Sequence, residues 1–319
     1  MLNESEVMQD SEFVSRETER ADATEKKLIE VDVLNSTPSV VAPEGDPPPM
    51  VIDSNLVCDA KEEEFHNGWA EQIVIEEVMV DESFECITAP EGRKVAEWLG
   101  DITGKKVLDV GCGAGEASVY FAKQGADVTA SDLSLGMLGV VNKLADRHGV
   151  KVKTAQATAE VLPFPDDYFD VVYTGNLLHH VDLEKTLGEM RRVLKPGGSF
   201  VSWDPLAHNP VINIYRMIAT KVRTPDEHPL RMSDIKRFSK YFHSVEYETY
   251  WLTTLWIFVQ FCFIERVNPN RERYWKKVIK EHTRLAGVYG FFDKIDRILL
   301  KCFPSLKRFC WNVVIRGTK

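Results

Sequence analysis

Short aliphatic runs alternate with stretches of helical periodicity along most of the chain after residue 104. Such runs predict buried strands, and strands that alternate with helices are typical of a doubly wound sheet. The predicted strands are residues 107–110, 127–130, 150–155, 169–173, 199–203, 245–251 and 311–316. The predicted helices among them are residues 116–124, 138–147, 183–194, 209–220 and 233–241. The pattern therefore predicts an α/β fold with a doubly wound, seven-stranded, mostly parallel sheet.

Turn and capping residues add detail at two places. Before the first strand we expect helices over residues 71–79 and 88–99, the second with Thr88 as N-cap and Pro90 in its first turn. Between the fourth and fifth strands, residues 195–198 read Lys-Pro-Gly-Gly, which predicts a turn after the preceding helix.

Residues 252–307 separate the last two predicted strands and are rich in aromatic and basic side chains, with 11 basic and 5 acidic residues. The segment leaves the carboxyl end of a strand, where ligands bind in open α/β sheets, so we expect it to roof the ligand pocket. Two interpretations stay open: a helical cap with a buried apolar face, or a segment that lies on an anionic membrane surface. Its most apolar stretch, residues 251–264, is too short for a membrane span.

Charge is segregated along the chain. Residues 1–64 hold 5 basic and 17 acidic residues, a net charge of -12, whereas residues 205–319 hold 21 basic and 10 acidic residues, a net charge of +11. The acidic part lacks an apolar period, so a disordered tail is predicted over residues 1–60. The cysteines are scattered and no basic or apolar leader opens the chain, so we expect a cytoplasmic location, either soluble or peripheral to a membrane.

A glycine-rich turn follows the first predicted strand. Residues 107–115 read Val-Leu-Asp-Val-Gly-Cys-Gly-Ala-Gly and lead into a predicted helix. Glycine lets the backbone turn sharply and approach a ligand, and the helix start offers unpaired N–H groups. A dinucleotide fingerprint needs glycine at its sixth position, which is Glu116 here. Asp109, within the strand, suits the cationic amino-acid end of a ligand better than a pyrophosphate.

The glycine turn, together with Asp132 and the segment 158–164, resembles class I S-adenosylmethionine-dependent methyltransferases. The resemblance is to the small-molecule branch, which includes ubiquinone and menaquinone methyltransferases. It implies a Rossmann-like methyltransferase fold, S-adenosylmethionine as cofactor, and a helical insertion before the last strand that minimal members lack. The implied division is a tail over 1–60, lid helices over 61–104, a cofactor-binding core over 105–251, the cap insertion over 252–307 and the final core strand over 308–319.

The resemblance also implies the residues that contact the cofactor. Asp132 ends the second strand and is expected to bind the ribose. Thr158 stands where most relatives have an acid that accepts a hydrogen bond from the adenine, and a threonine accepts one more weakly. The expected cofactor contacts are Asp109, Gly111, Cys112, Gly113, Gly115, Asp132, Leu133, Met137, Thr158, Ala159, Glu160 and Asn176.

Candidate catalytic residues follow the fourth and fifth strands. Either His179 or His180 could act as a general base near neutral pH, although one member of such a pair often packs structurally. Asp204 and His208 come after the fifth strand, on the same ligand face. The acids that accompany an equivalent histidine in quinone-methylating relatives are absent, so no metal is predicted.

The resulting hypothesis is a methyltransferase that acts on a small acceptor, and the aromatic insertion favours a lipophilic or aromatic one. A non-catalytic S-adenosylmethionine-binding assembly or regulatory protein is the alternative, because it would keep the same cofactor site. No nucleic-acid partner is expected, since the Asn/Asp-Pro-Pro-Tyr signature of nucleic-acid methylation is missing after the fourth strand. The acceptor and its reacting atom, the catalytic base, the oligomeric state and the role of the acidic tail remain open.

Overall fold

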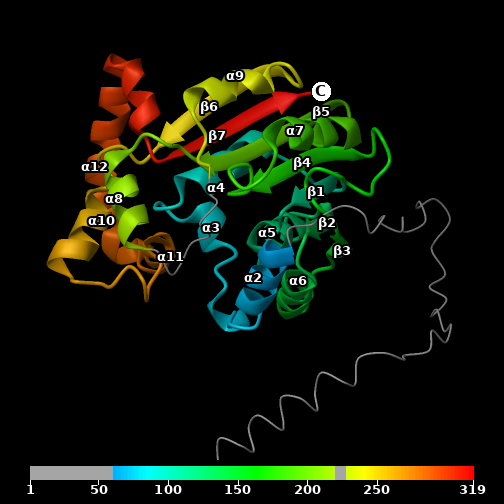
Figure 1. The fold of residues 1–319 in the computed structure, drawn as a ribbon, viewed down its shortest axis with the longest axis horizontal. Helices are drawn as coiled ribbons and strands as arrows, with labels where there is room; N and C mark the ends of the chain where they lie inside the picture. The colour runs from blue at the N-terminus through cyan, green and yellow to red at the C-terminus, as the bar shows by residue number, and fades with distance from the viewer. Residues whose placement is uncertain (1–59, 220–227) are drawn as a thin grey trace, which may run out of the picture. The chain divides into compact units, whose positions relative to one another are not determined.

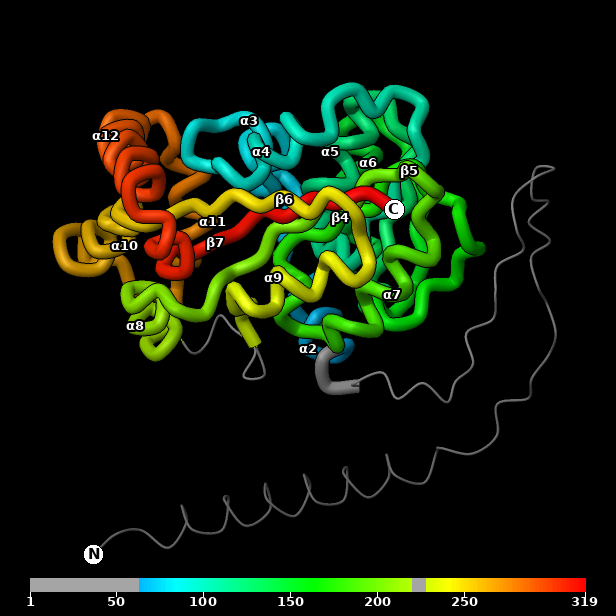
Figure 2. The backbone as a smooth tube through the Cα atoms, turned by 90° about the horizontal axis from the view of Figure 1, so that it is seen from above, coloured from blue at the N-terminus to red at the C-terminus, as the bar shows by residue number. Residues whose placement is uncertain are grey.

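The computed structural model describes residues 60–219 and 228–319, which form a sheet covered by helices on both faces (Figures 1 and 2). The sheet has seven strands in the order β3-β2-β1-β4-β5-β7-β6. β7 is antiparallel to its neighbours β5 and β6, and the remaining pairs are parallel. This confirms the predicted sheet. The strands are β1 Lys106–Val110, β2 Asp127–Asp132, β3 Lys153–Gln156, β4 Phe169–Gly175, β5 Leu194–Pro205, β6 His243–Tyr250 and β7 Asn312–Thr318.

Two apolar layers cover the sheet because successive strand residues point to opposite faces. Leu108 and Val172 pack against α7 and α9 on one face, whereas Val107 and Val171 pack against α4, α5 and α6 on the other. These helices are α4 Pro90–Leu99, α5 Glu116–Lys123, α6 Leu135–His148, α7 Leu183–Val193 and α9 Met232–Phe238. With both faces covered, the loops at the carboxyl ends of the strands are left to form a site.

The segment before the sheet differs from the prediction. The helix expected over residues 71–79 is wrong: α2 Ala60–Ala70 comes earlier, and a 3₁₀ turn, Ile75–Glu77, and the short helix α3 Glu82–Glu85 lie between α2 and α4. The turn is flanked by Val74 and Val78, both with extended backbone, as β-branched residues favour.

Thr88 is not an N-cap either, although α4 does begin at Pro90. Ala89 holds the cap position without a capping side chain. The Thr88 hydroxyl instead donates a hydrogen bond to the carbonyl oxygen of Val278, 3.0 Å away. A contact with a residue 190 positions further along the chain therefore replaces the expected local one.

Local contacts shift other boundaries. α6 begins at Leu135, earlier than predicted, because the Ser134 hydroxyl accepts a hydrogen bond from the Met137 N–H at 3.1 Å. β3 begins three residues later than predicted. The residues expected to form a turn, 195–198, lie within β5, which pairs with β4 at Leu194 and again from Ser199 onward. The left-handed φ of Gly197, +75°, accommodates the irregular register there.

Helices fill the connection between β6 and β7, and we call α10, α11 and α12 the cap. They pack with α8 around their own apolar cluster, which includes Phe258 and Tyr274. Both views place α8, α10 and α12 beside the end of β6 and the start of β7 (Figures 1 and 2). The elements are α8 Pro210–Ile218, α10 Trp256–Val259, the π-helical turn Gln260–Ile264, α11 Tyr274–Lys280, α12 His282–Cys302 and the 3₁₀ turn Pro304–Phe309.

Two predictions concern parts of the chain beyond the described ranges. The acidic tail predicted over residues 1–60 lies outside the described ranges except for residue 60. Residue 220, the end of the helix predicted over residues 209–220, also lies outside them. Within residues 60–219 and 228–319, no helix combines the length and the apolar character needed to cross a membrane.

Candidate functional site

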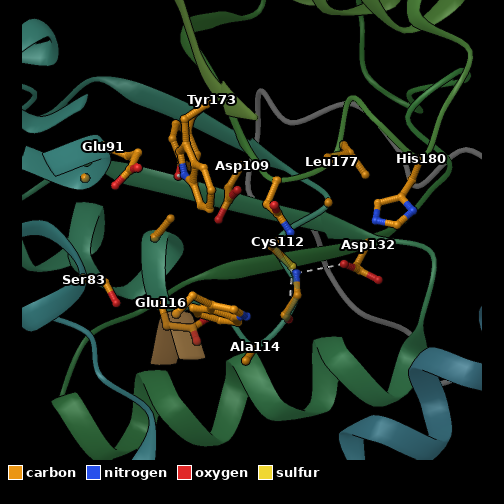
Figure 3. Close-up of a pocket in the computed structure, with 18 of the residues that line it drawn as sticks. Ser83, Glu91, Asp109, Cys112, Ala114, Glu116, Asp132, Tyr173, Leu177 and His180 are labelled. Atoms are coloured by element: carbon orange, nitrogen blue, oxygen red, sulfur yellow. Dashed lines mark hydrogen bonds between the residues drawn. The ribbon is translucent and has the colours of Figure 1, made fainter. Parts of the chain in front are cut away.

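A cavity of about 690 Å³ lies at the carboxyl ends of β1, β2, β4 and β5 (Figure 3). Asp109, Asp132, Gly175 and Trp203 line it from the ends of these four strands. Side chains from α2, α3 and α4, and from α11 of the cap, complete its walls. Its volume falls within the range of about 300–1,000 Å³ that is typical of small-molecule sites.

The glycine turn forms one wall and has a left-handed backbone at each of its glycines. Their φ angles are +67° at Gly111, +51° at Gly113 and +87° at Gly115. A Cβ at Gly115 would stand 2.8 Å from Cγ2 of Val141, and one at Gly111 would stand 2.7 Å from the Leu177 side chain. A Cβ at Gly113 would meet nothing within 4 Å, so Gly113 leaves space beside the cavity. The backbone conformation explains why glycine occupies these positions.

Asp132 ties the end of β2 to this turn. One carboxylate oxygen accepts a hydrogen bond from the Gly113 N–H and the other from the Ser134 N–H, both at 2.9 Å. Burial raises the pKa of Asp132, and these backbone hydrogen bonds and nearby His66 oppose the rise. The carboxylate thus holds the turn and the start of α6 in one arrangement.

Asp109 is a second buried carboxyl group in the cavity wall. Its side chain accepts a hydrogen bond from the Ser118 hydroxyl at 2.6 Å. Burial raises the pKa of Asp109 to about 7, and the negative charges of Asp132 and Glu116 add to the rise. A ligand cation placed beside Asp109 would favour its ionised form.

Most of the predicted cofactor residues meet at the cavity, and two do not line it. Met137 is fully buried between α2 and α6, where it packs with Ala70 and Ala114. Gly115 lies behind the turn as the N-cap residue of α5. The predicted residues that do line the cavity are Asp109, Gly111, Cys112, Gly113, Asp132, Leu133, Thr158, Ala159, Glu160 and Asn176.

Of the candidate catalytic residues, only His180 lines the cavity. His179 is buried beside Asp204, with its Nδ1 2.9 Å from a carboxylate oxygen. Complete burial holds the pKa of Asp204 well above the usual range of an aspartate. His208 is exposed at the surface and lies away from the cavity lining. The structure therefore separates residues that the sequence placed on one ligand face.

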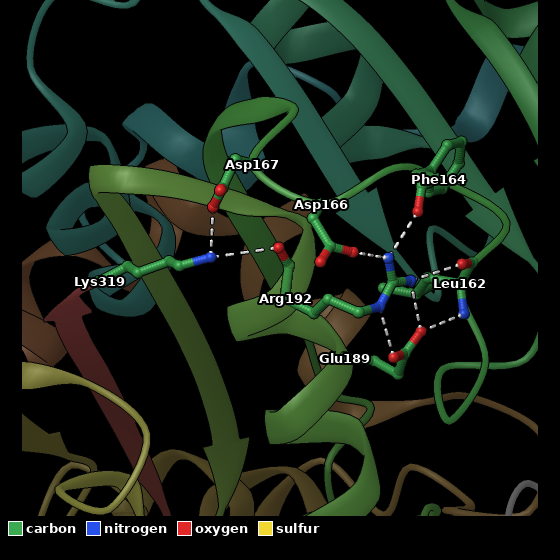
Figure 4. A network of polar contacts seen from close by, with 7 residues as sticks. All are labelled: Leu162, Phe164, Asp166, Asp167, Glu189, Arg192 and Lys319. Atoms are coloured by element: carbon green, nitrogen blue, oxygen red, sulfur yellow. Dashed lines mark hydrogen bonds and ion pairs between the residues drawn. The ribbon is translucent and has the colours of Figure 1, made fainter. Parts of the chain in front are cut away.

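An arginine network supports the wall that contains residues 158–160 (Figure 4). The Arg192 guanidinium donates hydrogen bonds to the carbonyl oxygens of Leu162 and Phe164, at 2.9 and 2.8 Å. Glu189 accepts from the Leu162 N–H at 2.9 Å and pairs with Arg192. Such paired charges fix the loop after β3 without entering the cavity.

Aromatic side chains and an acid form the far wall, which the sequence analysis did not predict. Trp203 donates a hydrogen bond from its indole N–H to the Tyr173 hydroxyl at 2.9 Å. Glu91, in the first turn of α4, accepts one from the Asn312 amide at 2.6 Å. Trp251, Trp275 and Trp311 also line the cavity. These residues share no local motif, so the sequence carried no signal that joins them.

The helix α2 covers the cofactor-side wall through short polar and cation–π contacts. The Asn67 side-chain oxygen accepts hydrogen bonds from the Ser134 hydroxyl at 2.6 Å and the Gly136 N–H at 3.0 Å. The guanidinium of Arg273, the N-cap residue of α11, lies 3.9 Å from the centre of the Trp69 ring. Thus α2 bridges α6 and α11.

The comparisons with known proteins agree with this geometry. Residues 108–202 match a family described as a methyltransferase domain. The chain is 36% identical over 150 residues to a sterol 24-C-methyltransferase of Gibberella zeae, covering 46% of this chain and 38% of that one. It is 41% identical over 110 residues to a demethylmenaquinone methyltransferase of Renibacterium salmoninarum, covering 34% and 45%. The match spans about half or less of each of these relatives' length.

A solved structure supports the fold alone. A chain in the complex of a methyltransferase activator of Haloferax volcanii aligns over 80% of this chain and 96% of its own length, with a TM-score of 0.52 and 16% identity. This alignment confirms the predicted fold, and the family match indicates a methyltransferase domain over residues 108–202. In the described parts of the chain, no group of three or more His, Cys, Asp or Glu residues is arranged to hold a metal ion.

Proposed function

We propose that the chain binds S-adenosylmethionine and methylates a small, lipophilic or aromatic acceptor, because residues 108–202 match a family described as a methyltransferase domain. The observation that carries the proposal is that the glycine turn, Asp109 and Asp132 share one cavity with an aromatic wall. When bound, this cofactor supplies an electrophilic methyl group. The chain then has to align the acceptor, remove a proton where one is lost, and exclude water.

The residues of the glycine-turn wall fit this cofactor. A Cβ at Gly113 would point into open space beside the cavity, so the backbone there can approach a ligand closely. Asp109 provides a buried negative partner for an ammonium group, and we assign it to the amino-acid end of the cofactor. We assign Asp132 to the ribose and the segment 158–160 to the adenine.

The histidines fit roles away from proton transfer. His180 lines the cavity (Figure 3), so we assign it to the wall around the cofactor. We assign the buried pair of His179 and Asp204 to positioning the segment that carries Asn176 and His180. His208 receives no role in the reaction. We therefore place the proton-accepting group at the aromatic end of the cavity.

The aromatic wall supports a flat or lipophilic acceptor. Tyr173, Trp203, Trp251 and Trp311 line this part of the cavity, and large aromatic surfaces favour binding of apolar rings. The two relatives named above are methyltransferases of a sterol and of demethylmenaquinone, by name. An acceptor of this lipophilic kind would suit the cavity.

We also propose that α8 and the cap rest on an anionic membrane surface. Large apolar side chains are exposed there, among them Met217 (78% exposed), Phe263 (74%) and Ile264 (68%). Exposed apolar side chains on a segment rich in basic residues are typical of membrane-surface segments. Sedimentation with anionic and neutral vesicles tests this. Binding to anionic vesicles should fall in the Met217→Glu and Phe263→Glu variants, and equal sedimentation of all proteins would contradict the proposal.

Isothermal titration with S-adenosylmethionine and with NAD tests the function. We expect binding of S-adenosylmethionine alone. Asp132→Ala should weaken it at least about tenfold, because a charge-assisted hydrogen bond is lost, whereas Asp127→Ala, at the exposed start of β2, should not. Absence of binding would refute the methyltransferase proposal. Binding without transfer of a labelled methyl group to lipid and phenolic extracts would favour the alternative, a non-catalytic S-adenosylmethionine-binding assembly or regulatory protein.

A further inference from the structure

A buried carboxyl group, Glu91, lines the end of the cavity away from Asp132. Glu91 is only 8% exposed, although it lies in the first turn of α4, where an acid would ordinarily face solvent. Figure 3 places Glu91 on the opposite side of the cavity from Asp132 and His180, with Asp109 between them. Glu91 therefore lies outside the part of the cavity assigned to the adenosine.

The polar atoms around Glu91 are incompletely paired. Asn312, at the start of β7, donates its amide N–H to Glu91 at 2.6 Å. The Asn312 side-chain oxygen and the indole N–H of Trp251 are both buried, and neither has a hydrogen-bond partner within residues 60–219 and 228–319. Buried polar groups are nearly always hydrogen-bonded in folded proteins, so unpaired ones in a cavity wall point to a ligand.

Burial gives Glu91 the acid strength that proton transfer near neutral pH requires. It raises the pKa of Glu91 to about 7, while Asn312 and the nearby Trp251 indole, which lies outside hydrogen-bond geometry, favour the ionised form. Tyr250 of β6 and Tyr289 of α12 interact electrostatically with Glu91, and burial raises the pKa of each hydroxyl further above its usual range. Glu91 is thus the one of these groups that titrates near neutrality.

The rings around Glu91 define the shape of the ligand. The Trp251 and Trp311 ring centres lie 5.9 Å apart at 65°, and a hydrogen bond joins Trp203 to Tyr173. All four line the same cavity as Glu91. A flat ring that enters between them would bring a polar substituent toward the carboxylate.

We propose that the Glu91 end of the cavity is the acceptor subsite, that it takes a flat aromatic alcohol, and that the Glu91 carboxylate accepts the proton of the acceptor's hydroxyl. This rests on the methyltransferase function proposed above. The O–H bond breaks, its proton goes to a Glu91 oxygen, and its electron pair stays on the acceptor and drives bond formation to the methyl group. The pair of the broken methyl–sulfur bond stays on sulfur.

Binding of two matched probes tests the subsite. 2-Naphthol and 2-methoxynaphthalene, which lacks the O–H, are titrated calorimetrically into the full chain saturated with S-adenosylhomocysteine. Glu91→Gln should lower the affinity for 2-naphthol at least about tenfold, because its hydroxyl needs a charged acceptor. The affinity for 2-methoxynaphthalene should stay unchanged. Glu97→Gln, on the exposed side of the same helix, is the control and should behave as the wild type. Affinity for S-adenosylmethionine should stay unchanged in both variants.

Transfer of a tritiated methyl group to 2-naphthol tests proton acceptance. Glu91→Gln should slow it at least about a hundredfold, as expected for loss of a general base, and Glu91→Asp should restore part of the rate. The subsite proposal is overturned if Glu91→Gln weakens the binding of both probes equally, leaves 2-naphthol binding unchanged, or loses affinity for S-adenosylmethionine. Binding without transfer in the wild type would overturn proton acceptance. Failure of S-adenosylmethionine to bind the wild type would instead refute the proposed function, and the probe titration on the unloaded chain would still decide the role of Glu91.

Discussion

The two ends of the cavity are built in opposite ways. The acids and glycines of the cofactor end come from turns that follow β1, β2 and β3 in order, so these residues and the segment 158–160 lie between 109 and 160. The aromatic end joins α4, β5, the end of β6 and β7, and its Glu91–Asn312 hydrogen bond spans 221 residues. One end is therefore a local motif, while the other exists only after the last strand enters the sheet.

Both ends hold a buried carboxyl group with a pKa of about 7, yet their surroundings differ. Asp109 is surrounded by other acids, Asp132 and Glu116, which raise its pKa beyond the effect of burial. Glu91 has neutral polar neighbours, Asn312 and Trp251, which lower the pKa that burial raises. The first environment favours a cationic ligand, and the second favours a neutral group that can give up a proton.

The glycine turn offers the largest test of this contrast. Gly115→Ala should cost about 2–3 kcal/mol of unfolding free energy, because the left-handed backbone is strained and the new Cβ meets Val141. Gly113→Ala should cost about 1 kcal/mol of unfolding free energy, since only the backbone strain applies. It should also weaken the binding of S-adenosylmethionine, because the new Cβ enters the ligand's space. Urea unfolding and calorimetric titration measure the two effects. Equal losses of stability would contradict the packing assigned to Gly115.

The pH dependence of stability compares the two carboxyl groups. Each has a folded-state pKa near 7, above its unfolded value of about 4, so the folded chain binds more protons between those values and loses stability as pH rises through that window. Glu91→Gln and Asp109→Asn should each remove part of this loss. Each variant should be about 1–3 kcal/mol more stable than the wild type at pH 8, with the difference shrinking toward pH 4.

Ligand addition sharpens that comparison. Saturating S-adenosylmethionine at pH 8 should stabilise the wild type and Glu91→Gln equally, and Asp109→Asn less, because only Asp109 is assigned to the cofactor. Thermal unfolding with and without the ligand gives the shifts. If the unfolding free energy without ligand depends on pH in the same way in the wild type and in both variants, neither carboxyl group has a raised pKa in the folded chain.

The smallest expected effect concerns α2. Asn67→Ala removes the acceptor for Ser134 and Gly136, so amides in residues 60–70 should exchange up to about tenfold faster, for a loss of about 1 kcal/mol of local stability. Gln72→Ala is the control, because the exposed Gln72 amide donates its hydrogen bond to the nearby Gly68 carbonyl and does not reach α6 among the described residues. Hydrogen exchange read by mass spectrometry checks this, and identical exchange in the two variants would show that the Asn67 contacts do not hold α2.

Sequence reasoning succeeded where a feature depends on neighbours along the chain. The period of apolar residues predicted the sheet because each strand carries its own buried pattern. The three glycines of residues 107–115 predicted the turn because a left-handed backbone restricts the residue type at the position itself. Asp132 was predicted as a ligand-binding acid from its distance along the chain to that turn. It fits because β1 and β2 are adjacent parallel strands whose ends meet at one edge.

The failures share a physical cause. Thr88 was predicted to be the N-cap residue of a helix, but its hydroxyl donates a hydrogen bond to the carbonyl oxygen of Val278 in α11. His208 seemed to face the ligand, but it lies at the surface. Glu91 was not singled out in the sequence, because an acid in a first helical turn is ordinary where the helix dipole favours negative charge. Nothing nearby in the sequence says that Asn312 and Trp251 cover it.

The sequence by itself thus determined the class of fold, the glycine turn and the acids beside it, because local backbone geometry and strand periodicity are properties of short segments. Only the tertiary structure decided which histidine reaches the cavity, which carboxyl groups lose water, and which rings form the far wall. Those properties depend on burial, and burial depends on segments from α4 to β7 that come together only when the sheet is complete.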